Sequence, residues 1–119
     1  MKVLIVDNSR AMRIIVKRTL KQAGIVASVT EADSRSQAFE AIDAGKPDVI
    51  LTGCSMPDRH GLEFVRAITD SDLDVPVGVV VSQGASELQK QATTAGACFL
   101  LTKPLTADSL RDALLGVFG

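Results

Sequence analysis

The stretch Pro47-Asp48-Val49-Ile50-Leu51-Thr52-Gly53 decides the fold, together with Met56-Pro57 and the segment that starts at Gly61-Leu62. Its centre is a short run of aliphatic and β-branched residues, which is typical of a strand buried on both faces. Met56-Pro57 then marks a turn, and a segment of helical period follows. A buried strand that leads into a helix predicts a parallel sheet with helical crossovers.

The same alternation of apolar runs and helix-period segments extends along the whole chain. In the first helical segment, the spacing predicts an apolar face of Met12, Ile15, Val16, Thr19, Leu20 and Ala23. We predict strands at Lys2–Val6, Val26–Ala32, Val49–Thr52, Val75–Val81 and Ala97–Leu101. Parallel strands joined by right-handed crossovers give an α/β fold, here a three-layer doubly wound sheet of five parallel strands.

The composition indicates one compact domain and excludes some classes of partner. A chain of 119 residues with 46% apolar residues has room for one core, so we expect a single domain over residues 1–119 without an output domain. The net charge of -1 provides no overall field that would attract nucleic acid, and we predict no nucleic-acid partner.

The N-terminus and the cysteines indicate a cytoplasmic protein. The apolar run from Val3 ends at Asp7, so neither a signal peptide nor a membrane span is expected. Cys54 and Cys98 lack the density of a secreted disulfide scaffold and the spacing of a zinc site. They are expected at opposite ends of parallel strands, which would place them beyond disulfide reach.

The topology predicts where a binding site forms. In a doubly wound sheet, sites lie beyond the carboxyl ends of the strands. Four segments are expected to meet at that edge and to line one pocket: Asp7-Asn8, Gly53-Cys54-Ser55, Ser82-Gln83 and Lys103-Pro104.

These segments resemble the receiver domains of two-component response regulators, in particular the single-domain chemotaxis type related to CheY. The resemblance covers the entire chain and implies the flavodoxin-like strand order 2-1-3-4-5. Its motifs are Val3-Leu4-Ile5-Val6-Asp7-Asn8-Ser9 with Met12-Arg13, Pro47-Asp48-Val49-Ile50-Leu51 with Met56-Pro57 and Gly61-Leu62, Val79-Val80-Val81-Ser82, and Thr102-Lys103-Pro104-Leu105.

The resemblance also identifies what this sequence lacks. In that family, an aspartate three residues before the Met of Met-Pro accepts a phosphoryl group, and Gly53 occupies this position here. Glycine offers no nucleophilic side-chain atom, so the family's reaction is excluded there. The acidic pair that holds Mg²⁺ in the family is Asp7-Asn8 here, and Ser55 aligns with its backbone-carbonyl ligand. With these candidate ligands we expect weak or absent Mg²⁺ binding, and no other cofactor.

Three further positions match the family's signalling residues. Ser82 and Lys103 match positions that contact the phosphoryl group in the family. Two interpretations stay open: a residual anion site, or a structural role in which Lys103 pairs with Asp7 and Ser82 bonds the local backbone. The switch position on the fifth strand is Leu100, which has no hydroxyl, and strand alternation places Phe99 on the opposite face.

Some polar residues have a functional and a simpler interpretation. His60 is expected to be solvated rather than a ligand, and Cys54 to be buried rather than reactive. The outward side of the first helix is basic, and is either a solvated face or a docking surface for an acidic partner. The residues of this basic side are Arg10, Arg13, Lys17, Arg18 and Lys21.

The sequence therefore predicts a receiver-like signalling module that is not an enzyme. It would act by contact with a protein partner through the face formed by residues 85–119, independently of aspartyl phosphorylation. One alternative is a phosphorelay receiver with a displaced acceptor at Asp58, Ser55 or Thr52. Another is a small nucleotide- or flavin-binding protein. The sequence contains no Gly-rich phosphate loop, which argues against this alternative.

Overall fold

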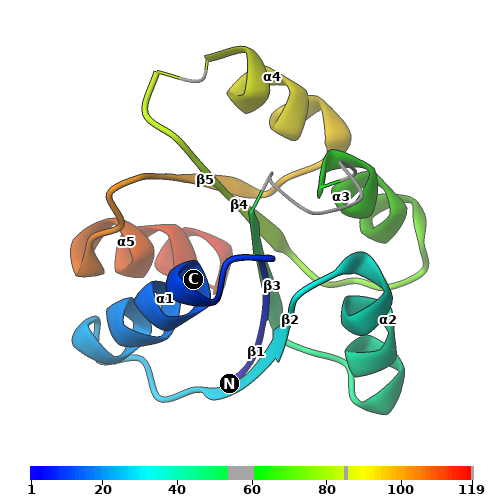
Figure 1. The fold of residues 1–119 in the computed structure, drawn as a ribbon, viewed down its shortest axis with the longest axis horizontal. Coiled ribbons are helices and arrows are strands. Elements are labelled where there is room, and N and C mark those ends of the chain that lie inside the picture. Colours follow the sequence, from blue (N-terminus) through cyan, green and yellow to red (C-terminus); the bar gives the residue numbers. More distant parts are fainter. Residues whose placement is uncertain (54–60, 85, 119) are drawn as a thin grey trace.

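Strands and helices alternate along the chain in the computed structural model, which describes residues 1–53, 61–84 and 86–118 (Figure 1). The elements are β1 (Lys2–Val6), α1 (Arg10–Gln22), β2 (Ser28–Ala32), α2 (Arg35–Ala44), β3 (Val49–Gly53), α3 (Gly61–Asp70), β4 (Val77–Val81), α4 (Ser86–Ala95), β5 (Phe99–Thr102) and α5 (Ala107–Phe118).

The strands form one parallel sheet in the order β2-β1-β3-β4-β5. Helices α1 and α5 cover one face, and α2, α3 and α4 cover the other (Figure 1). This arrangement confirms the predicted three-layer doubly wound sheet and its strand order. The two edge strands are β2 and β5, so surfaces built on them lie at opposite sides of the molecule.

Two apolar clusters form the core, one on each face of the sheet. Phe64 of α3 is fully buried in the first and meets the ring of Phe39 edge-on, with 5.4 Å between the ring centroids. Burial of one such ring contributes about 1.5–3 kcal/mol. In the second cluster, α1 and α5 place Leu20 and Leu110 against the sheet. The central strands β3 and β4 are buried on both faces, as their largely apolar sequences predict.

Three strands begin later than the sequence predicts. β2 begins at Ser28, where pairing with Lys2 of β1 starts, and Val26 remains 90% exposed outside the sheet. β4 begins at Val77 and β5 at Phe99, each two residues after the predicted start. Residues of high β propensity continue beyond the point where a neighbouring strand is available. The start of each strand is therefore set by pairing with that neighbour.

The predicted apolar face of α1 is correct except at one position. Val16, Thr19 and Leu20 are buried, whereas Ile15 is 42% exposed. Ser9 caps the helix, because its hydroxyl accepts the backbone N–H of Met12 at 3.3 Å. None of the helices in the described part of the chain is long and apolar enough to span a bilayer.

Candidate functional site

The predicted site residues lie at the carboxyl edge of the sheet. Asp7 directly follows β1, Gly53 is the last residue of β3, Ser82 follows β4 and Lys103 follows β5. Backbone hydrogen bonds extend the sheet into this edge: the N–H of Asp7 donates to the carbonyl of Ala32 at 3.0 Å, and that of Lys103 to Val81 at 2.9 Å. The parallel topology therefore places these positions at the same edge of the sheet.

Asp7 is the buried carboxylate of this edge, with 8% of its surface exposed. Its Oδ1 accepts the backbone N–H of Ser9 at 2.8 Å. Ser9 is also the N-cap of α1, so the carboxylate is bound to the turn that starts the helix. This hydrogen bond satisfies one Asp7 oxygen and orients the other toward β3.

The second oxygen of Asp7 lies over Gly53. A Cβ built on Gly53 would collide with Oδ2 of Asp7 and would stand 3.2 Å from its Cγ. Gly53 is therefore a close approach between the Asp7 carboxylate and the β3 backbone. A side chain at position 53 requires Asp7 to move.

Arg13 and Glu31 belong to the same edge, and the sequence analysis did not place them there. The Arg13 guanidinium donates through Nη1 to the backbone carbonyl of Asp7 and through Nε to Glu31 at 3.0 Å. Lys17 donates to the other carboxylate oxygen of Glu31 at 3.2 Å. Arg13 is therefore not part of a solvated basic face, which corrects that prediction. Two features of the sequence could have indicated this contact: Arg13 lies one helical turn before Lys17, and the β2 segment carries an acidic residue.

These contacts shift the titration of Glu31. Burial alone would raise the pKa of its carboxyl, but hydrogen bonds from Lys17 and Arg13 and their positive charges outweigh burial. The pKa of Glu31 is consequently lowered from its ordinary value of 4.5. The network attaches α1 to the edge strand β2 beside the Asp7 turn.

Asn8, Ser82 and Lys103 reach the edge without the contacts that a structural role would require. Asn8 and Ser82 are exposed, and Lys103 is half-buried. Within the described residues, Lys103 forms no ion pair with Asp7, and the Ser82 hydroxyl makes no hydrogen bond to the backbone. The two contacts expected from the structural interpretation are thus not formed.

The switch position has an aliphatic side chain on the predicted face. Leu100 packs against the cluster under α2, α3 and α4, whereas Phe99 packs on the α1 and α5 side. The Phe99 ring fills the space above Gly78, where a Cβ would collide with three of its ring atoms. The predicted opposite orientation of these neighbours is confirmed.

The described residues fit Mg²⁺ poorly. Mg²⁺ favours charged oxygen ligands in octahedral geometry. In residues 1–53, 61–84 and 86–118, no group of three or more acidic, His or Cys side chains is arranged to hold a metal. One Asp7 oxygen already accepts the Ser9 N–H. The candidate reactive or ligating residues Cys54, Ser55, Asp58 and His60 lie outside the described residues.

Thr52, one of the displaced acceptors considered, is enclosed. Its surface is 1% exposed, and its hydroxyl donates to the carbonyl of Gly53 at 3.1 Å. A phosphoryl donor does not reach a hydroxyl in this position without opening of the sheet edge.

Comparison with known proteins assigns this chain to a family. The family model of the response regulator receiver domain matches residues 3–115. Chemotaxis protein CheY1 of Helicobacter pylori is 34% identical over 122 residues, with 100% of this chain and 98% of that protein aligned. Chemotaxis protein CheY of Pseudomonas aeruginosa is 32% identical over 120 residues, which cover 99% of this chain and 96% of that protein.

Solved structures agree with the sequence comparisons. The chemotaxis response regulator CheY4 of Vibrio cholerae has a TM-score of 0.82 at 30% identity, covering 98% of this chain and 97% of that chain. A putative response regulator from Chloroflexus aurantiacus has a TM-score of 0.89, covering 98% and 95% of the two chains; at 23% identity it supports the fold alone. The chain therefore belongs to the response regulator receiver domain family.

Proposed function

We propose that this receiver transmits a signal by binding a protein partner, without enzymatic activity and without phosphorylation on aspartate. The observation that carries the proposal is Gly53 at the end of β3, with the Asp7 carboxylate over its backbone. A covalent phosphoryl acceptor needs a nucleophilic side chain, and this position has none. The space for one is already taken by Asp7.

The charge at the site supports the same proposal. The transferred phosphoryl group is anionic, and Mg²⁺ is the ion that neutralises it in phosphoryl transfer. Asn8 carries no charge, and Asp7 is bound to the Ser9 turn. We therefore expect weak or absent Mg²⁺ binding in this receiver, and no other cofactor.

The face of residues 85–119 is the proposed partner surface, as the family resemblance implies. Exposed apolar side chains occur there on α4 and α5: Leu88 is 40% exposed, Leu115 58% and Phe118 47%. Exposed apolar groups of this size are common at protein interfaces and unfavourable in water. A cytoplasmic location and the lack of a nucleic-acid partner remain predictions from the sequence.

The proposal is tested by exposing the purified protein to acetyl phosphate, and separately to beryllofluoride, in the presence of Mg²⁺. Intact mass spectrometry is expected to show no acid-labile adduct, and tryptic mapping no modified acid. A stoichiometric acid-labile phosphoryl adduct would overturn the proposal. An active receiver that carries the acceptor aspartate is the positive control for the donor.

The same experiment distinguishes a displaced acceptor. If phosphorylation occurred at Asp58, Ser55 or Thr52, site mapping would locate it, and replacement of that residue would abolish it. The burial of Thr52 disfavours it as an acceptor. A nucleotide- or flavin-binding role would instead give a visible absorbance spectrum or a nucleotide-dependent rise in Tm.

A further inference from the structure

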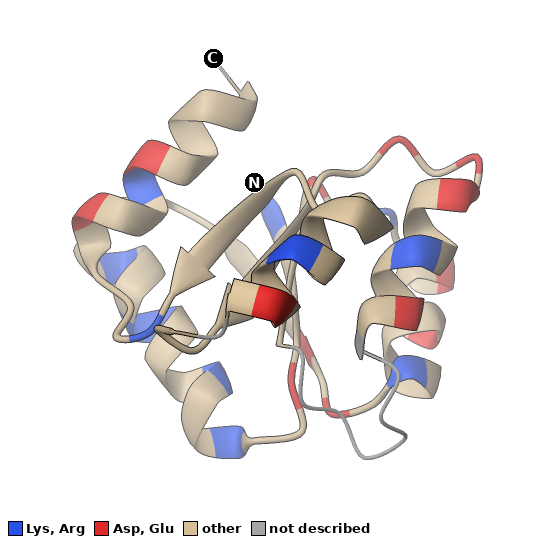
Figure 2. Cartoon of the chain, turned by 90° about the horizontal axis from the view of Figure 1, so that it is seen from above, with Lys and Arg blue, Asp and Glu red and all other residues tan. Residues whose placement is uncertain are grey.

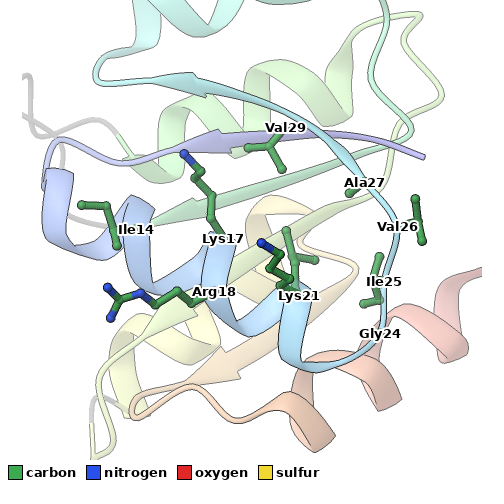
Figure 3. A pocket seen from close by; sticks show the side chains of 10 residues that line it. Ile14, Lys17, Arg18, Lys21, Gly24, Ile25, Val26, Ala27 and Val29 are labelled. Atoms are coloured by element: carbon green, nitrogen blue, oxygen red, sulfur yellow. The ribbon is translucent and has the colours of Figure 1, made fainter.

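A groove of ≈ 670 Å³ lies between α1 and the segment that leads into β2 (Figure 3). Its walls come from the outer side of α1 and from residues 24–29. The lining residues are Ile14, Lys17, Arg18, Leu20, Lys21, Gly24, Ile25, Val26, Ala27 and Val29. All except the three cations are apolar or glycine, and the lining contains no acidic residue.

Two apolar side chains of this groove are exposed to solvent. Val26 is 90% exposed and Ile14 37%. Val26 lies beyond the first residue pair of β2, so the sheet does not require a β-branched residue there. An exposed apolar patch rimmed by charged residues marks an interaction site more often than a random surface does.

The charge of the groove is strongly one-sided. Helix α1 carries five basic residues and no acidic one, while each other helix carries at least one Asp or Glu (Figure 2). Arg13 and Lys17 are both paired with Glu31. Arg18 and Lys21 form no ion pair with any described residue. The groove therefore combines two uncompensated cations with an apolar floor.

We propose that this groove binds an acidic, amphipathic peptide segment of a partner protein. Carboxylates of the segment would pair with Arg18 and Lys21, and its aliphatic or aromatic side chains would cover Ile14 and Val26. The groove lies beside the edge strand β2, whereas the 85–119 face includes the opposite edge strand β5 (Figure 1). The groove is thus a different surface from the partner surface described above.

The lining favours a peptide over nucleic acid or a second copy. Phosphate backbones would use the cations but would leave the apolar floor unfilled, and the groove contains no aromatic ring on which a base could stack. Residues 70–74 form an acidic segment with one aliphatic residue, Leu73, which is partly buried against the protein's own core. A second copy would have to pull Leu73 away from that core to insert it into the groove.

The test uses a fluorescein-labelled synthetic helical peptide with Leu residues along one face and Glu residues along the other. Its binding is measured by fluorescence anisotropy. The reference probe is the same peptide with every Glu replaced by Gln. The Glu peptide is expected to bind more tightly and to lose affinity as salt rises. In ¹⁵N spectra, the shifted amide signals are expected to belong to residues 14–29.

Two variants locate the binding. R18E/K21E should weaken the Glu peptide about tenfold, and V26D should weaken it with an unchanged free energy of unfolding, since Val26 is exposed. The control K46E/R66E makes the same charge change at an exposed lysine and an exposed arginine, both outside the groove and outside the 85–119 face. Circular dichroism and urea unfolding establish that each variant is folded.

Several results would overturn the proposal. One is equal weakening by R18E/K21E and K46E/R66E, which would mean a general charge effect. Another is tighter binding of a DNA duplex or of phosphatidylserine vesicles than of the Glu peptide. A third is concentration-dependent dimerisation of the wild type that R18E/K21E abolishes, which would assign the groove to a second copy. Loss of binding at residues 85–119 would leave this proposal unaffected.

Discussion

The carboxylate of Asp7 occupies the space that a side chain on Gly53 would need. A Cβ at position 53 would stand 3.2 Å from Cγ of Asp7 and would collide with its Oδ2. The other oxygen accepts the Ser9 N–H at 2.8 Å, which keeps the carboxylate in place. The Asp7 carboxylate can therefore take this position only because the residue at the end of β3 has no side chain.

We predict that Gly53→Ala lowers the free energy of unfolding by about 1 kcal/mol. Replacing glycine in a strand gains up to about 1 kcal/mol through the unfolded chain. The methyl group displaces Asp7, however, and costs the charge-assisted hydrogen bond from Ser9, worth about 1.5–3 kcal/mol. Urea unfolding measures the difference. In an Asp7→Ala background, Gly53→Ala should become neutral or stabilising, and an equal cost in both backgrounds would contradict the proposed contact.

Restoring carboxylates should restore the reaction that the family performs. We predict that N8D/G53D forms an acid-labile adduct with acetyl phosphate and Mg²⁺, since Lys103 and Ser82 remain at the same edge. Without Mg²⁺, the crowded carboxylates should lower the Tm, and added Mg²⁺ should raise it. N8D/G53N, which lacks the nucleophile, is the matched control. A folded but inert N8D/G53D would mean that more than the missing acids separates this site from an active receiver.

The Glu31 network should make a pH-dependent contribution to stability. Because the pKa of Glu31 is lowered on folding, its contribution is fully present above the ordinary value of 4.5 and is lost as the pH falls through the folded pKa. We predict that Glu31→Gln costs at most about 1 kcal/mol at neutral pH, given the exposure of the pair. The cost should vanish in acid and shrink in high salt.

The control for this prediction is Glu40→Gln. Glu40 is exposed on α2 and forms no ion pair with a described residue. Urea unfolding of both variants across the acid range measures the difference. If Glu31→Gln costs the same at every pH, the network does not stabilise the carboxylate form.

The packing of Phe99 on Gly78 should be intolerant of a methyl group. We predict that Gly78→Ala costs about 1–3 kcal/mol, because the added methyl group displaces the partly buried Phe99 ring from its packing against the core. Phe99→Leu in the same chain should recover part of this loss. Gly116→Ala is the matched control: nothing lies within 4 Å of its added Cβ, and a gain of up to about 1 kcal/mol is expected in helix α5. Thermal and urea unfolding measure both changes.

Much of the fold was predictable because its causes are local. The apolar runs of β3 and β4 predicted central strands, and β1 begins and ends as predicted at Lys2–Val6. Strand starts were less predictable, as Val26 illustrates. Its β propensity suits a strand, but no residue of β1 is available to pair with it. Strand boundaries depend on the neighbour as well as on the segment itself.

The site was predictable in its position and unpredictable in its contacts. Parallel topology alone places Asp7, Gly53, Ser82 and Lys103 at one edge. The partner of each charge, by contrast, depends on side-chain directions across elements. The sequence offered Lys103 as a partner for Asp7, whereas the fold brings Arg13 to the Asp7 carbonyl and to Glu31 on β2.

By itself, the sequence determined the order of strands and helices, the edge where the site forms and the lack of a nucleophile at Gly53, because periodicity and residue identity suffice for each. Only the tertiary structure decided that Asp7 covers Gly53, that Arg13 is bound within the edge, and that Arg18 and Lys21 flank an apolar groove. These are contacts between elements far apart in the chain, and their geometry arises only when the sheet and its helices pack together.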